Sequence, residues 1–144
     1  MAEFRDSIDI AAPPETVFGY LTTAEGMTAW MGQYAELDPQ PGGVFAVDIA
    51  GYPVRGRYLR VDYPRTVVVS WGFAGSDTLP EGASTVEFRL TPIAGGTTVE
   101  LTHSDLPETE VRGHADGWTH FLPRLAVAGP GGDAGPDPWR PLDH

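Results

Sequence analysis

The sequence predicts a single α+β domain in which a curved, mostly antiparallel sheet packs against one late amphipathic helix. Two observations support this prediction. Between residues 44 and 103, apolar and polar residues alternate in successive segments separated by turns rich in glycine and proline. Over residues 111–126, side chains instead recur at helical spacing and collect on one face: Val111, His114, Ala115, Trp118, Phe121, Leu122 and Leu125. Because this helix follows nearly all the strands, we expect it to bury that face against the sheet and to leave a pocket.

The first part of the chain predicts one strand followed by two short helices. In residues 4–10 the apolar side chains share one parity, which is typical of a half-buried strand. The run Pro13-Pro14-Glu15 can open a helix, because proline is tolerated in the first turn and glutamate complements the helix dipole. A second helix is expected over residues 24–31, capped by Thr22 or Thr23.

The middle of the chain predicts successive strands joined by turns, followed by the long helix. Alternation covers residues 45–49, 56–61, 67–71, 86–90 and 99–103, with turns at 38–43, 51–53, 62–65 and 93–96 and a longer loop at 72–82. An acidic connector is expected over residues 106–113, and Pro123 is expected to kink or restart the helix. We assign residues 1–128 to one domain and expect residues 129–144, rich in glycine and proline, to form a disordered tail.

The composition excludes several function classes. The 144 residues include nine basic residues, all of them arginine, and 20 acidic ones, which gives a formal net charge of -11. Attraction to nucleic acid or to an anionic membrane needs clustered positive charge, so neither partner is expected. The absence of lysine and cysteine excludes Schiff-base, disulfide and thiolate chemistry. Since we find no signal-peptide pattern and no apolar run of bilayer length, we expect a cytoplasmic protein, either a monomer or a homodimer.

Several short segments together resemble a known family. They are IAAPPETVF at residues 10–18, Trp30, GGVF at 42–45, GRYLRV at 56–61, VVVSW at 67–71, STV at 84–86, GTTVELTHS at 96–104 and GW at 117–118. In this order they are similar to the activator-of-Hsp90-ATPase-like (AHSA1-like) branch of the START-related helix-grip superfamily. The resemblance implies a helix-grip fold, with a seven-stranded antiparallel sheet wrapped around a long C-terminal helix and an apolar cavity between them. It also implies a binding module, as most such proteins are, although a minority are enzymes acting on polyketides.

The expected cavity wall combines large apolar side chains with a few polar ones. Trp118 lies at the centre of the helix face and is either a core tryptophan or part of the pocket wall. His103 shares the inward parity of its strand, so it is either a satisfied buried histidine or a group that orients a ligand or acts as a general base. The expected ligand-binding residues are Trp30, Phe45, Val47, Tyr58, Trp71, His103, His114, Trp118, Phe121 and Leu122.

Other polar residues were weighed as sites. Arg60 shares the parity of Tyr58 and would face inward if that parity continues along the strand, whereas an outward position would make it an ordinary surface charge. Residues 103–105, His-Ser-Asp, cannot form a triad, because successive residues of a strand point to opposite faces. His114 and His120 lie about 240° apart around a helix, so they cannot share a metal. We therefore expect no metal and no cofactor.

Three functions remain open. The first is a small-molecule binding protein that holds an apolar or aromatic ligand in the cavity between the sheet and the helix. The second is an enzyme of polyketide cyclase or dehydratase type, with His103 as acid or base and Tyr58 or Arg60 polarising a carbonyl. The third is a co-chaperone-type module for protein interaction. We favour the first, with an apolar small molecule as partner and without catalytic residues, because the expected lining is mostly apolar.

Overall fold

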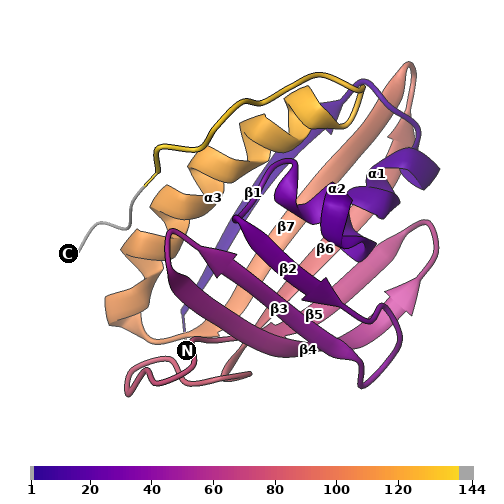
Figure 1. Ribbon diagram of the computed structural model, residues 1–144. Helices are drawn as coiled ribbons and strands as arrows, with labels where there is room; N and C mark the ends of the chain where they lie inside the picture. The colour runs from indigo at the N-terminus through magenta and orange to yellow at the C-terminus, as the bar shows by residue number, and fades with distance from the viewer. Residues whose placement is uncertain (1, 140–144) are drawn as a thin grey trace.

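The computed structural model describes residues 2–139, which form a seven-stranded antiparallel sheet and three helices (Figure 1). The elements follow the order β1 (Ala2–Ile10), α1 (Pro14–Thr22), α2 (Ala24–Thr28), β2 (Tyr34–Leu37), β3 (Val44–Ile49), β4 (Tyr52–Asp62), β5 (Thr66–Trp71), β6 (Ser84–Ile93), β7 (Gly96–Leu106) and α3 (Glu108–Ala128). The strands lie in the order β1-β7-β6-β5-β4-β3-β2, so the strands from β2 to β7 are neighbours in sequence order. The α+β helix-grip fold expected from the sequence is confirmed.

The long helix α3 packs on the sheet and runs beside β1 (Figure 1). Its buried side chains form one stripe: Gly117, Trp118, Phe121, Leu122, Leu125 and Ala128. The expected connector over residues 106–113 is wrong, because β7 continues to Leu106 and only Pro107 separates it from the helix. Pro107 at the N-cap removes no intrahelical hydrogen bond, because the first N–H groups of a helix have no acceptor within it, and the two glutamates of the first turn complement the helix dipole. The helix also passes through Pro123 as one element, without the restart that we considered.

The two short helices pack against the same core as α3. Thr23 caps α2, because its side-chain oxygen accepts a hydrogen bond from the backbone N–H of Gly26 at 3.0 Å. After α2, the buried Trp30 contacts Phe88 of β6 edge to face, with ring centroids 6.4 Å apart, and Phe88 contacts Trp118 of α3 at 5.9 Å. These helices therefore close one end of the space between the sheet and α3.

The short edge strand β2 was not expected from the sequence. Its four residues, Tyr34–Leu37, pair with β3 in antiparallel register from Tyr34 opposite Asp48 to Leu37 opposite Phe45. Each β2 side chain is exposed or only half-buried, so the alternation that marks a core strand is weak here. The turn at residues 38–43 then leads into β3, as expected.

A β-bulge in β4 decides the position of Arg60. Tyr58 pairs with Val69 and Arg60 pairs with Val68, so β4 has one extra residue at this point. The bulge breaks the parity: Tyr58 is fully buried, Leu59 is 51% exposed, and Arg60 is exposed and ion-paired with Asp62 at 3.1 Å. The inward position considered for Arg60 is therefore wrong, and Arg60 cannot polarise a ligand in the core.

Residues 129–139 have no helix or strand beyond a turn, but they turn back along α3 instead of extending into solvent (Figure 1). Arg124 donates hydrogen bonds to the carbonyl oxygens of Ala134 at 3.1 Å and Gly135 at 2.8 Å. His120 contacts Asp137, with His120 Nε2 2.7 Å from Asp137 Oδ1. We call residues 129–139 the C-terminal strap. The strap therefore lacks regular structure but has hydrogen-bond partners on α3, and the disorder expected for the tail stays a prediction. Residues 140–144 of the expected tail lie outside the described residues.

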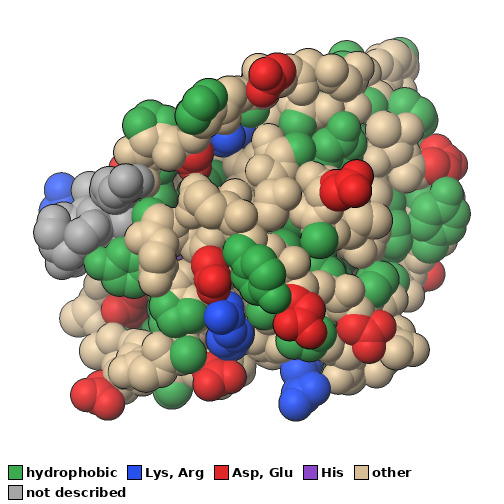
Figure 2. Space-filling view, in the orientation of Figure 1, with side chains coloured by type: hydrophobic (Ala, Val, Ile, Leu, Met, Phe, Trp, Pro, Cys, Tyr) green, Lys and Arg blue, Asp and Glu red, His purple; other side chains and the backbone are tan. Residues whose placement is uncertain are grey.

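Charged side chains are scattered over the surface. On the face shown in Figure 2, arginines occur singly and do not gather into a basic patch. The described ion pairs between arginine and a carboxylate are exposed or half-exposed: Arg5–Glu3, Arg55–Asp48, Arg60–Asp62 and Arg89–Glu87. Pairs in such positions contribute little to stability, about 0–1 kcal/mol each. The fold is therefore held mainly by its apolar core.

Candidate functional site

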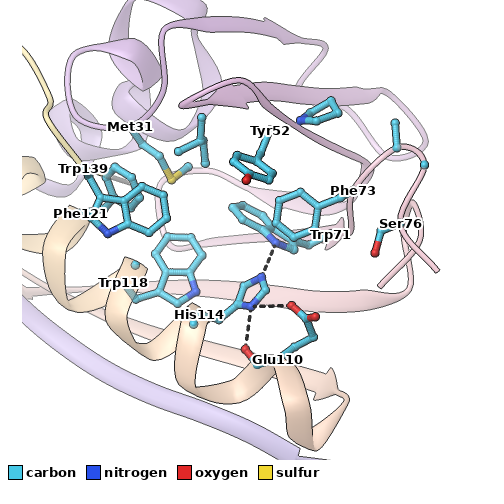
Figure 3. Close-up of a pocket in the computed structure, with 16 residues that line it drawn as sticks. Met31, Tyr52, Trp71, Phe73, Ser76, Glu110, His114, Trp118, Phe121 and Trp139 are labelled. Carbon is cyan, nitrogen blue, oxygen red and sulfur yellow. Dashed lines mark hydrogen bonds and ion pairs between the residues drawn. The ribbon is translucent and has the colours of Figure 1, made fainter. Parts of the chain in front are cut away.

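A pocket of about 410 Å³ lies between α3, the β3–β4 hairpin, the end of β5 and the loop that follows β5 (Figure 3). The lining residues, which define the candidate pocket, are Met31, Ile49, Tyr52, Pro53, Trp71, Phe73, Ala74, Gly75, Ser76, Glu110, Gly113, His114, Gly117, Trp118, Phe121 and Trp139. The innermost of these, such as Trp71 and Trp118, are buried, whereas Gly75 is exposed. The pocket therefore opens to solvent near the β5–β6 loop.

Aromatic rings form a large part of the pocket wall. The Trp71 and Trp118 rings are 5.2 Å apart, and Phe73 lies 6.5 Å from Tyr52. At the other end, Phe121 lies 5.1 Å from Trp139, which the C-terminal strap delivers to the pocket. In Figure 3, Phe121 and Trp139 stand at one end of the pocket, Tyr52, Phe73 and Trp71 stand at the other, and Trp118 lies between them. Such surfaces offer a large apolar contact area for a ligand of similar character.

Two glycines on α3 leave room for the pocket. Gly113 and Gly117 lie one turn apart on the helix face that lines it. A Cβ atom at Gly113 would meet no heavy atom within 4 Å, and one at Gly117 would lie 3.4 Å from the Trp139 ring. A glycine inside a helix costs about 1 kcal/mol relative to alanine, so the open space at Gly113 exists at some cost in helix stability.

His114 lines the pocket as a neutral ring with both nitrogens engaged by the protein. Its Nε2 lies 3.2 Å from the indole Nε1 of Trp71, which donates the hydrogen bond. Its Nδ1 lies 2.9 Å from the backbone oxygen of Glu110, so Nδ1 carries the proton and donates it there. Burial lowers the pKa of His114, and the backbone oxygen and the negative charge of Glu110 only partly oppose this shift. A ligand therefore meets the face of this ring.

His103 lies behind the pocket wall, inside a closed hydrogen-bond chain. Trp118 Nε1–H donates to His103 Nδ1 at 3.0 Å, which leaves Nε2 as the donor to Ser84 Oγ at 2.8 Å. The Ser84 hydroxyl in turn donates to the carbonyl oxygen of Trp71 at 2.7 Å. Burial first, and the neighbouring His114 second, lower the pKa of His103 to about 2. A general base needs a free lone pair, and the one on His103 Nδ1 already accepts the hydrogen bond from Trp118.

The structure brings together four of the ten expected ligand-binding residues. Trp71, His114, Trp118 and Phe121 line the pocket. The other six are buried in the core and do not line it: Trp30, Phe45, Val47, Tyr58, His103 and Leu122. Tyr58 donates its hydroxyl hydrogen to the carbonyl oxygen of Leu21 at 2.8 Å, and burial raises its pKa above the ordinary value. It therefore cannot orient a ligand in this pocket.

Sequence reasoning missed the residues that come from loops and helix glycines. A signal existed on α3, since Glu110, Gly113, His114, Gly117 and Phe121 recur at spacings of three and four. No local pattern indicated the contribution of the β5–β6 loop or of the β3–β4 hairpin, because their side chains reach the pocket only through the sheet topology. Trp139 was assigned to the tail and therefore left out.

The chain was also compared with known families and structures. The sequence model of the family described as Activator of Hsp90 ATPase homolog 1-like protein matches residues 11–128. The chain belongs to this family. This agrees with the resemblance noted from its segments.

Solved structures with the same fold include three informative relatives. An AHSA1-like protein from Rhizobium etli is 40% identical, with 99% of this chain and 92% of that chain covered and a TM-score of 0.74. CalU16 from Micromonospora echinospora is 28% identical, with coverages of 94% and 69% and a TM-score of 0.75. The Aha1 dimer from Colwellia psychrerythraea is 25% identical, with coverages of 89% and 96% and a TM-score of 0.75. No curated protein matches the sequence.

Two further features of residues 2–139 bear on partners and cofactors. Within this range, no three His, Asp or Glu side chains are grouped so that they could hold a metal ion. The helices in the same range also include none that is long and apolar enough to cross a membrane.

Proposed function

We propose that this protein binds an apolar or aromatic small molecule in the candidate pocket. The observation that carries the proposal is a pocket of about 410 Å³ with rings of tryptophan, phenylalanine and tyrosine around it. This volume lies within the range of small-molecule sites, about 300–1,000 Å³. Its lining residues come from the C-terminal helix, from the sheet and from the loop that follows β5.

The energetics of the pocket favour an occupant. A dry, rigid cavity costs about 24 cal/mol per Å³, so 410 Å³ would cost on the order of 10 kcal/mol, as much as the whole stability of many domains. The pocket is therefore open to water when no ligand is bound. A ligand that displaces this water buries apolar surface at a gain of about 25 cal/mol per Å².

The geometry disfavours the enzyme hypothesis. The enzyme hypothesis relied on His103, Tyr58 and Arg60, of which the first two are satisfied in the core and the third is on the outer surface. The co-chaperone hypothesis keeps support from the family alone. The expectation of a monomer or a homodimer stays a prediction, and one relative forms a dimer.

Filling the pocket at Gly113 tests the proposal. We expect the wild-type protein to bind the neutral probe N-phenyl-1-naphthylamine, with increased probe fluorescence and a raised melting temperature. Gly113→Leu sends a side chain into the open space of the pocket without a backbone clash. We expect this variant to weaken probe binding by about tenfold or more, because the leucine occupies volume that the ligand needs.

The control is Gly19→Leu in α1. A Cβ atom at Gly19 also meets nothing within 4 Å, and Gly19 does not line the pocket. This variant should bind the probe like the wild type. No probe binding by the wild type, or equal binding by the wild type and Gly113→Leu, would contradict the proposal. Trp118→Ala is less suitable, because it also leaves the buried His103 Nδ1 without its donor.

A further inference from the structure

We propose that the ligand of this pocket carries a positive charge, as an amine or a quaternary ammonium group attached to an apolar body, and that Glu110 binds this charge. The inference rests on the proposed function and adds the chemical class of the ligand. It depends on three observations: Glu110 lines the pocket, its carboxylate contacts no cation among the described residues, and aromatic rings lie near it.

Glu110 is the single acidic or basic residue, other than the neutral His114, among the residues that line the pocket. None of the described arginines lines it. The side chain of Glu110 is 27% exposed, which places its carboxylate at the mouth. In Figure 3, Glu110 and Ser76 stand at one end of the pocket, whereas Met31, Phe121 and Trp139 stand at the other. The pocket is therefore polar and acidic at its mouth and apolar at its far end.

The contacts of the Glu110 carboxylate within residues 2–139 do not include a cation. Thr78 donates its hydroxyl hydrogen to Oε2 at 3.2 Å. Oε1 lies 3.7 Å from His114 Nδ1, but the proton on that nitrogen points to the backbone oxygen of Glu110, 2.9 Å away. The Nε2 of the same ring accepts from Trp71, so the ring cannot take a second proton without losing that bond. Among the residues that the structure describes, the carboxylate at the mouth therefore has no cationic partner.

The neighbouring rings favour the same sign of charge. The faces of aromatic rings attract cations, most strongly in tryptophan. The Phe73 and Trp71 rings lie 5.8 Å and 6.3 Å from the His114 ring, which Glu110 contacts, so they surround the acidic end. An anionic group in this position would face a carboxylate and ring faces, with no positive side chain among the described lining residues, which is unfavourable in a partly buried site. The net charge of -11 also attracts a cationic ligand to the protein over a longer distance.

Three ligands of closely similar shape test the charge. They are (naphthalen-2-ylmethyl)trimethylammonium, its neutral isostere 2-(2,2-dimethylpropyl)naphthalene, and the anion naphthalen-2-ylmethanesulfonate, each titrated by calorimetry. We expect the wild-type protein to bind the cation at least about tenfold more tightly than the neutral isostere, from the carboxylate and the ring faces together, and the anion most weakly.

Glu110→Gln keeps the size of the side chain and its ability to accept from Thr78, and removes the charge. It should reduce cation affinity about fivefold or more and leave the affinity for the neutral isostere unchanged. The matched control is Glu108→Gln, which makes the same change of net charge two residues earlier on α3, outside the pocket. This control should keep nearly all of the cation preference.

The outcomes separate the two proposals. If the neutral isostere and the cation bind equally, or if Glu110→Gln and Glu108→Gln have the same effect, the inference about charge is wrong and the binding function stands. Anion binding as tight as cation binding would overturn the inference as well. If none of the three ligands binds, both proposals fail.

Discussion

His103 shows how completely one buried polar residue is satisfied in this core. It accepts from Trp118, donates to Ser84, and through Ser84 is connected to the backbone of β5. A buried polar group without partners costs about 1–3 kcal/mol, so this chain of donors and acceptors determines which tautomer the protein holds. It also fixes the orientation of Trp118, whose other face lines the pocket. His103 therefore holds one of the side chains that line the pocket, Trp118, by a hydrogen bond.

The neutral state of His103 makes the protein sensitive to acid. The pKa falls from 6.5 in an exposed histidine to about 2 in the folded protein, so below pH 6.5 the unfolded chain binds a proton that the folded chain does not. Stability contributed by neutral His103 is thus present above pH 6.5 and decreases as the pH falls, by up to about 1.4 kcal/mol per pH unit. His114, whose pKa is also lowered, acts with the same sign.

His103→Gln isolates this effect. We expect the variant to be less stable at neutral pH by about 1–3 kcal/mol, because glutamine cannot reproduce both hydrogen bonds with the same geometry. Its stability should fall less steeply than that of the wild type as the pH is lowered from 6.5, since the histidine proton is no longer involved. Urea unfolding at a series of pH values measures both quantities. All other titrating groups are common to the two proteins, so parallel curves would show that His103 is not the source.

Strand parity predicted which residues face inward but not what they contact. The inward position of His103 and Tyr58 was predicted correctly, because alternation sets the face of the sheet. Whether an inward side chain lines a cavity or lies in the packed core depends on what covers that part of the sheet. Trp118 and the β5–β6 loop decide this here, and strand alternation carries no information about either.

At the level of elements, the strap is held on α3 mainly by polar contacts. Arg124 donates to two strap carbonyl groups and, through Nε, to the carbonyl oxygen of Trp30 at 3.1 Å. Trp139 at the end of the strap stacks on His120, with centroids 6.2 Å apart. One arginine thus joins α3, the strap and the backbone of Trp30, two residues beyond the end of α2.

Arg124→Gln should release the strap. We expect backbone amides in residues 130–139 to exchange with deuterium about tenfold faster or more, because the guanidinium bonds that hold their carbonyl groups are lost. Hydrogen exchange followed by mass spectrometry measures this locally. Arg112→Gln, a surface change on the same helix, is the control and should leave strap exchange unchanged. Equally faster exchange in β6 and β7 would indicate general destabilisation and contradict a local role.

Element types were predictable where periodicity was long, and element boundaries were not. Sixteen residues of helical spacing were enough to predict α3, and the β6–β7 hairpin followed from strict alternation. The bulge in β4 could not be predicted, because one extra residue does not change the composition noticeably. It does reverse which side chains face the core in the rest of the strand. The strap lacks any periodicity, and its position depends on Arg124, which is 10 and 11 residues away from the groups it binds.

At the level of the whole molecule, the charge is strongly unbalanced. Twenty acidic residues face nine arginines, so the folded state carries net self-repulsion at neutral pH. The ion pairs are few and near the surface, so they offset little of it. Burial of the apolar core must therefore outweigh the repulsion between the surface charges.

Salt should accordingly stabilise the protein. We expect the melting temperature at neutral pH to rise between low salt and about 0.15 M sodium chloride, where the screening length is about 8 Å. Near pH 4.5, the calculated isoelectric point, the same addition should have a smaller effect because the net charge is close to zero. Differential scanning calorimetry at the two pH values makes the comparison. A larger effect at the acidic pH, or a fall in melting temperature at neutral pH, would show that self-repulsion does not limit stability.

The arrangement of the tryptophans gives the protein a built-in optical reporter. Three of its four tryptophans, Trp71, Trp118 and Trp139, line the pocket, and the fourth, Trp30, is buried elsewhere with its indole N–H bound to the carbonyl oxygen of Tyr20. Any molecule that enters the pocket must therefore alter the polarity around most of the emitting indoles while leaving Trp30 as an internal reference. Unlabelled protein can thus be screened against compound collections by its own ultraviolet emission.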